Sequence, residues 1–228
     1  MNQQNCHNPM RASKRRFTGA ITAAVVSVAM TAPLAGVLSP ASAATGHAGS
    51  HHLGNRSLAA VLAADKGYDQ NWGDFDILEK AVTTVLGAKP DSPVMVLTQG
   101  RKRLTAFIPT DRAFRRLAFA LTGHRPRTER GTFRAIAHAA DVDTLEAVLL
   151  YHVIPGRTLG SAKVGKLDGA TVTTAAQVPL TIRIRRGKVV LVDQDPDARN
   201  ARVVAVDINK GNKQIAHAVN RVLRPIDL

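Results

Sequence analysis

Cysteine is almost absent from this sequence, and aromatic residues are scarce. The 228 residues include a single cysteine, Cys6, which excludes an intrachain disulfide framework and a cysteine-ligated metal site. Aromatic side chains make up 4%, with one tryptophan, which argues against a stacking platform for single-stranded nucleic acid. Acidic residues are also few: 17 of them oppose 31 lysines and arginines, and the formal net charge is +14. This excess of positive charge predicts an affinity for polyanions.

Catalytic motifs are missing as well. The sequence contains no G-x-S-x-G nucleophile elbow, no H-E-x-x-H zinc motif and no glycine-rich phosphate loop after a strand. We therefore expect no catalytic residues, no cofactor and no enzyme activity. An unrecognised hydrolase is the alternative.

The N-terminus has the pattern of a secretory signal peptide. Four basic residues and no acidic one precede an apolar stretch at 19–38, and small residues follow it. We expect 1–43 to be the signal peptide, with cleavage after Ala43 or Ala44 and export by the general or the twin-arginine route. The alternative is a membrane span, which a proline and a glycine within the stretch disfavour.

Export changes the charge and the expected partners. Loss of the four basic residues leaves 27 basic against 17 acidic residues, a net charge of +10. The expected location is secreted, either extracellular or in the cell envelope. Because the protein would leave the cytoplasm and carries no DNA-recognition motif, we expect no nucleic-acid partner. An unknown extracellular protein or an anionic envelope polymer is expected instead, bound by a monomer.

The rest of the chain predicts a short tail and one domain. Residues 44–56 are rich in glycine, histidine and serine, which predicts a flexible tail before a domain at 57–228. Helical spacing of apolar residues predicts helices beginning at Ser57 and at 74–86, 110–121, 133–140 and 143–152. Short apolar runs predict strands at 94–97, 104–108, 171–174, 180–185, 188–193, 203–208 and 215–223, the first two joined as a hairpin. Helices come first and most strands afterwards, which indicates an α+β fold.

Three segments, in order, resemble the fasciclin domain family. They are L-T-A-F-I-P-T-D-R-A-F at 104–114, V-L-L-Y-H-V-I-P-G at 148–156, and V-V-A-V-D-I at 203–208 followed by I-A-H-A-V-N-R-V-L-R-P at 215–225. The resemblance implies a single domain with a twisted β core flanked by N-terminal and central helices. It also implies an exported or cell-surface protein that acts in adhesion, matrix or protein contacts and not in catalysis. The motif residues carried over are Thr110, Phe114, Tyr151, His152 and His217.

Physical chemistry favours a structural role for most of these motif residues. His152 lies on the apolar face of its predicted helix, so we expect it to be buried and hydrogen-bonded to the backbone. In animal members of the family, Tyr-His and Asp-Ile segments are proposed receptor contacts, and here they correspond to 151–152 and to Asp207 and Ile208. For Asp207 two roles stay open, binding or hydrogen bonding to the loop that follows it. Lys213 and Gln214 replace an Asn-Gly pair that is usual in the family, so we expect a different turn there.

Basic and acidic clusters complete the candidate sites. The basic segment 122–132 is interpreted as a long loop and the first candidate binding surface, with Arg125, Arg127 and Arg130 as its contacts. A solvated basic face without a ligand is the alternative.

No metal site is predicted. The acidic segment 193–197 offers oxygen ligands, but it lacks the glycine and the glutamate of a calcium loop and is interpreted as a solvated turn. A copper or nickel site at 45–47 would require cleavage after Ala44.

Overall fold

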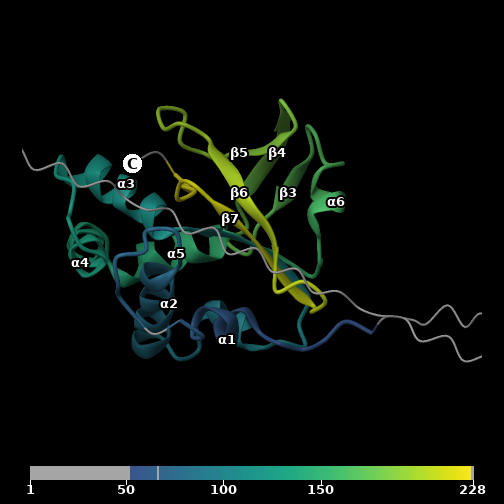
Figure 1. Cartoon of the computed structure of the whole chain (residues 1–228), viewed down its shortest axis with the longest axis horizontal. Coiled ribbons are helices and arrows are strands. Elements are labelled where there is room, and N and C mark those ends of the chain that lie inside the picture. The colour runs from purple at the N-terminus through teal and green to yellow at the C-terminus, as the bar shows by residue number, and fades with distance from the viewer. Residues whose placement is uncertain (1–51, 66, 227–228) are drawn as a thin grey trace, which may run out of the picture. The chain divides into compact units, whose positions relative to one another are not determined.

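A seven-stranded sheet and a group of helices make up residues 52–65 and 67–226, the part of the chain described by a computed structural model (Figure 1). The expected signal peptide and most of the expected tail lie outside these residues. The end of the expected tail belongs to the domain, because Gly54 forms a parallel bridge with Asn212. Of the helices described, none is long and apolar enough to cross a membrane.

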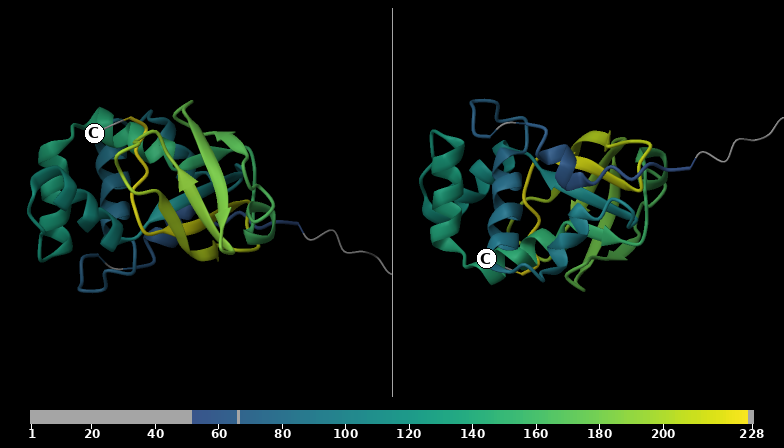
Figure 2. Two further views of the ribbon diagram at one scale, coloured as in Figure 1. Left: turned by 90° about the horizontal axis from the view of Figure 1, so that it is seen from above. Right: turned by 90° about the horizontal axis from the view of Figure 1, so that it is seen from below.

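The sheet has the strand order β2-β1-β7-β6-β5-β4-β3 and is strongly twisted (Figure 2). Its strands are β1 (Leu104–Pro109), β2 (Val153–Pro155), β3 (Thr171–Thr173), β4 (Pro179–Arg185), β5 (Lys188–Val192), β6 (Ala201–Ile208) and β7 (Gln214–Val219). Neighbours are antiparallel except β1 and β7, which run parallel. Every residue of β1 and of β7 is buried, as expected for strands covered on both faces.

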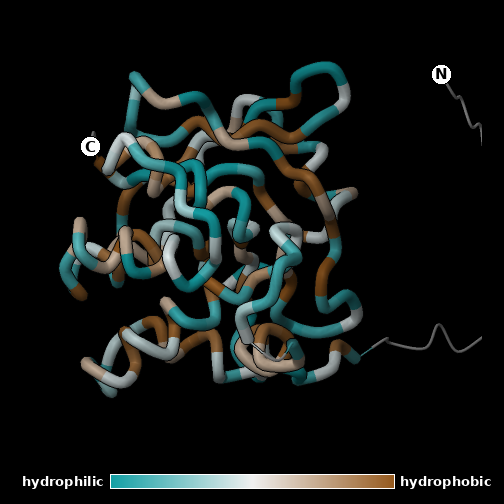
Figure 3. Tube along the Cα trace, turned by 60° about the vertical axis from the view of Figure 1, so that its left-hand side comes forward, coloured by the Kyte–Doolittle hydropathy of each residue, from teal (hydrophilic) through white to brown (hydrophobic). Residues whose placement is uncertain are grey.

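Most helices gather on one side of the sheet, where Figure 1 shows α2 to α5 together. The helices are α1 (Leu58–Leu62), α2 (Asp76–Ala88), the 3-10 helix η1 (Pro93–Thr98), α3 (Asp111–Thr122), α4 (Glu129–Ala139), α5 (Val142–Tyr151) and α6 (Ser161–Val164). Both hydrophobic and hydrophilic residues occur along the helical coils in Figure 3, as burial of one helix face requires. Their apolar faces form a first core with β1, and a second core fills the twist of the sheet around Phe107, Tyr151 and Leu191. This architecture confirms the predicted α+β fold.

Local patterns locate most elements within a few residues. Ser57 caps α1, and its side chain accepts a hydrogen bond from the backbone of Ala60. The predicted turn between β4 and β5 is present, with Arg186 and Gly187 both at positive φ, 53° and 72°. Such a two-residue turn matches the twist of an antiparallel hairpin. The short elements α6 and β2 were not predicted from the sequence.

The predicted strand at 94–97 and its hairpin are wrong. The segment is the 3-10 helix η1, which Pro93 begins and the Ser92 side chain caps by accepting from the backbone of Val94. A distant side chain holds the end of this helix: the amide of Gln214 donates to Val96 O within η1 at 2.7 Å and to the O of its C-cap residue Gln99 at 2.9 Å. The strand β1 pairs instead with β7 and β2.

Two predicted boundaries around α4 and α5 are also wrong. The expected loop 122–132 is shorter, since α3 runs to Thr122 and α4 begins at Glu129. Thr128 caps α4, where its hydroxyl accepts from the backbone of Gly131 at 3.1 Å. The expected start of α5 at residue 143 lies two residues late, because the cap is Asp141, whose carboxylate accepts from Thr144 N.

Candidate binding surface

The Tyr-His motif lies in the core at the end of α5. Tyr151 has no exposed surface and its hydroxyl donates to Pro179 O at 3.0 Å. His152 is 4% exposed; its Nδ1 lies 2.7 Å from Val148 O, and its Nε2 accepts from Leu223 N at 2.9 Å. These partners require the proton on Nδ1, and burial lowers the pKa of His152 to about 4. The pair therefore links α5 to β4 and to the segment after β7.

The second histidine of the motifs also bonds to the backbone. His217 is buried, with Nε2 2.8 Å from Leu159 O, and its Nδ1 accepts from Asp207 N at 3.3 Å. The carboxylate of Asp207 in turn accepts from the backbone N and the hydroxyl of Ser161, at 2.7 and 2.8 Å, which fixes the first turn of α6. Ile208 is half-buried against the helical core. Both members of the Asp-Ile segment thus hold the fold together.

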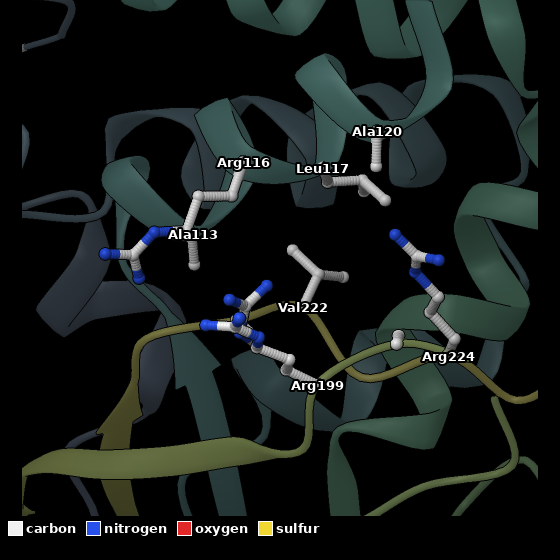
Figure 4. Close-up of a pocket in the computed structure, with 9 residues that line it drawn as sticks. Ala113, Arg116, Leu117, Ala120, Arg199, Val222 and Arg224 are labelled. Atoms are coloured by element: carbon white, nitrogen blue, oxygen red, sulfur yellow. The ribbon is translucent and has the colours of Figure 1, made fainter. Parts of the chain in front are cut away.

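Seven arginines surround α3 and the segments that pack beside it. We call them the arginine face: Arg112, Arg115, Arg116, Arg125, Arg199, Arg221 and Arg224. They line two hollows of about 40 and 390 Å³ that share Arg116, and neither hollow is lined by an acidic residue. Figure 4 shows the smaller one, with Arg116 extending from α3, while Arg199 and Arg224 come from two separate segments on the opposite side of the hollow.

The arginine face concentrates like charges in a partly buried setting. Burial lowers the pKa of Arg221, and repulsion from the neighbouring arginines lowers it further. Hydrogen bonds hold three other members: Arg115 donates to Pro126 O at 2.8 Å, Arg116 to Asn220 O at 2.7 Å, and Arg224 to the Asp195 carboxylate at 2.6 Å. A planar guanidinium fixed in this way can bind a phosphate or carboxylate group with two parallel hydrogen bonds.

The three arginines expected to bind do not form one surface patch. Arg125 is exposed and joins the arginine face, with its guanidinium 5.4 Å from the Phe119 ring. Arg127 is exposed, and Arg130 lies on α4 over the ring of Tyr68. Neither of the last two lines either hollow of the arginine face.

The model of the Fasciclin domain matches residues 81–225. The chain belongs to the Fasciclin domain family. No curated protein matches the chain. Among solved structures, a FAS1 domain pair from the insect cell adhesion molecule Fasciclin I matches with a TM-score of 0.51 and 13% identity, over 73% of this chain and 50% of that one. The chain thus spans about half the length of that pair, and the likeness shows the fold.

The remaining motif residues of this fasciclin domain are also packed inside. Thr110 is the N-cap of α3, although its side chain makes no capping hydrogen bond, and Phe114 is 3% exposed in the core. Like His152, His217 and Tyr151, both residues are buried, as expected for residues with a structural role. These buried side chains offer little surface for contact with a partner.

Two groups of candidate functional residues were not predicted from the sequence, one basic and one acidic. The basic group is Arg199, Arg221 and Arg224, which lie far from α3 in the sequence and reach it only in the folded chain. The segment 193–197, expected to be a solvated turn, is instead an anchor: Asp195 is 2% exposed and accepts from Ala198 N and from Arg224.

The second missed group is acidic and buried. Four carboxyl groups meet where α2, α3 and α4 begin, and they belong to Asp74, Asp76, Asp111 and Glu129. The first-turn positions of Asp76, Asp111 and Glu129 are the only sequence signal for them, since acidic residues are favoured at helix starts.

Proposed function

We propose that this fasciclin domain is an exported, non-catalytic adhesion module that binds an anionic polymer of the cell envelope through the arginine face. Family membership supports an adhesion or protein-interaction role at the cell surface. The N-terminal pattern of basic, apolar and small residues supports export. An anionic partner is chosen because seven arginines lie together on one partly buried face.

Like-charge repulsion makes an anion the matching ligand. Positive charges held near one another destabilise the unbound domain, and a phosphate or carboxylate between them removes that cost. Arg116 contributes to both hollows, so consecutive charged groups of a polymer can occupy the two sites together. Two weak sites used together bind far more tightly than either alone.

Binding of purified domain to defined polymers tests this function. We expect the domain to bind polyphosphate and a polyuronate, with an affinity that falls as salt rises. Reversal of three exposed arginines of the face, Arg112→Glu, Arg125→Glu and Arg199→Glu, should strongly weaken that binding. Surface substitutions of this kind usually change stability by less than about 0.5 kcal/mol each.

A charge-matched control separates the arginine face from net charge. Arg183→Glu, Arg185→Glu and Lys188→Glu change the same number of exposed charges on the β4–β5 hairpin. We expect this control to keep most of the polymer binding. Equal loss in both triple variants would refute a defined site. Binding to whole cell envelopes that disappears after protease treatment would show an extracellular protein as the partner instead.

A further inference from the structure

Three helices of this domain begin at the same place, and each begins with an acidic residue. Asp76 is the first residue of α2, Asp111 the first of α3 and Glu129 the first of α4. Asp74 lies just before α2. Carboxylate oxygens of Asp74, Asp111 and Glu129 lie within 4.8 Å of one another, and the same holds for Asp69, Asp74 and Asp76. The two sets share Asp74 and form one acidic cluster.

The cluster is buried and holds unused acceptors. Asp111 and Glu129 are 0% exposed, Asp76 is 3% and Asp74 is 8%. One oxygen of Asp111 accepts from Ile77 N at 3.0 Å, and one of Glu129 accepts from Asp69 N at 2.7 Å. Their other two oxygens, and both oxygens of Asp74 and of Asp76, have no hydrogen-bond partner among the described residues. Buried carboxylate oxygens without a partner are costly and call for a bound group.

Protein groups nearby balance only part of this negative charge. Three helix N-termini supply partial positive charges. Within residues 52–65 and 67–226, no salt bridge reaches Asp74, Asp76, Asp111 or Glu129. The guanidinium of Arg130 lies 5.7 Å from the ring centre of Tyr68, whose buried hydroxyl also lacks a partner in the described chain.

Protons are the competing explanation for the cluster. Burial raises the pKa of Asp76 to about 6, of Glu129 to about 7 and of Asp111 to about 8, and charges of neighbouring carboxylates add to the rise. Shared protons and a metal cation would therefore compete for the same oxygens. A direct measurement of cation binding distinguishes the two.

We infer that Asp74, Asp76, Asp111 and Glu129 form a calcium site at the junction of α2, α3 and α4. Carboxylate oxygens are the ligands that hard divalent cations prefer, and Ca²⁺ accepts six to eight of them at about 2.3–2.6 Å. Ligands on opposite sides of such an ion are thus about 5 Å apart, which matches the oxygens of Asp74, Asp111 and Glu129, all within 4.8 Å of one another. Asp76 is joined to this set through Asp74, from which it is separated by no more than the same distance. Mg²⁺ requires shorter, strictly octahedral bonds and usually retains several waters, so a buried and crowded set favours Ca²⁺.

Calcium would join parts of the chain that are distant in sequence. Asp74 belongs to the loop before α2, and the other three ligands open three separate helices. The arginine face adjoins the calcium site, because Arg115 lies 4.4 Å from the ring centre of Trp72. The two sites share no residue, so each proposal has its own variants and its own test.

The single tryptophan provides a direct probe. Trp72 lies two residues before Asp74. We expect Tb³⁺ added to the full chain to emit when Trp72 is excited, and Ca²⁺ to suppress that emission by competition at one site per chain. Trp72→Phe should lose the Tb³⁺ emission and keep the calcium-induced rise in melting temperature.

Thermal unfolding gives the second readout. With a Kd of about 0.1 mM, in the range of extracellular calcium modules, 10 mM Ca²⁺ should raise Tm by roughly 5–10 °C. The same concentration of Mg²⁺ should raise Tm much less. Asp76→Asn and Asp74→Asn, which preserve shape, should lose the calcium response, whereas the exposed Asp197→Asn should retain it.

The proposal fails under two results. One is a wild-type chain whose Tm and calorimetric heat do not change with Ca²⁺, which would assign the cluster to shared protons. The other is a calcium response that survives in folded Asp74→Asn and Asp76→Asn. Should either variant not fold, stoichiometric Tb³⁺ binding by the wild type still decides the proposal, because absence of binding overturns it.

Discussion

Acid should destabilise this fasciclin domain through His152, and replacing that residue should remove a defined part of the effect. In the folded state the imidazole is buried, and its two nitrogens bond to Val148 O and to Leu223 N. The second bond needs a nitrogen without a proton, so a charged ring loses an acceptor and also its solvation. For this reason burial lowers the pKa of His152 from 6.5 to about 4.

The magnitude follows from the difference between the two pKa values. Between pH 6.5 and about 4, the unfolded chain takes up a proton at His152 while the folded chain does not. The stabilising contribution is therefore complete above pH 6.5 and is lost as the pH falls through this window. At 1.36 kcal/mol per pH unit the loss is roughly 3 kcal/mol.

Urea unfolding of the wild type and of His152→Gln at several pH values measures this term. His217, with a pKa also lowered by burial, changes stability in the same direction, and the raised pKa values of the acidic cluster act in the opposite one. The difference between wild type and variant isolates His152. It should shrink by roughly 3 kcal/mol from pH 7 to pH 4. A difference that stays constant over this range would refute the reasoning, and the exposed His138→Gln serves as the control.

Three further outcomes are expected. Gln214→Ala should cost about 3 kcal/mol or more of unfolding free energy, because it leaves Leu58 N and the carbonyls of Val96 and Gln99 without their partner. The exposed Gln194→Ala should cost less than about 1 kcal/mol in the same urea titration. Asp195→Asn should lower that free energy by roughly 2–3 kcal/mol by removing the charge that holds Arg224. The purified domain should not turn over esters, peptides or glycans; ester hydrolysis that disappears in a folded His152→Ala protein would contradict the non-catalytic assignment.

Local sequence patterns were sufficient where neighbouring residues decide the structure. The strand β1 is a short apolar run that ends at Pro109, and Thr110 opens the next helix. The turn at Arg186 and Gly187 follows from a glycine that accepts positive φ between two alternating strands. Because these features are local, the family motifs could be identified from the sequence alone.

Sequence patterns failed where residues distant in the sequence determine the local structure. Val94 to Leu97 are apolar and β-branched in part, but Pro93 and the amide of Gln214 hold them as a 3-10 helix.

The start of α4 was missed although its signals are local. Glu129 stands in a strongly basic segment and was assigned to a loop, although Thr128 before it is a capping residue. The cap and the acidic first turn were signals that could have been used.

Neither candidate site could be predicted in full, because each one is assembled by the fold. Arg125 was identified from a local cluster, whereas Arg199 and Arg221 reach α3 only because the segments after β5 and β7 pack beside it. The carboxylates of Asp74 and Glu129 are 55 positions apart in the sequence, and the packing of helix starts brings them together.

The salt dependence of polymer binding tests the central claim most directly. For a linear polyanion, the logarithm of the binding constant falls linearly with the logarithm of the salt concentration, by nearly one unit of slope for each charge contact. The account predicts that reversing Arg112, Arg125 and Arg199 reduces the slope for polyphosphate by about three, while the matched reversals on the β4–β5 hairpin leave it unchanged. A slope that is the same in the wild type and in the arginine-face variant would contradict it.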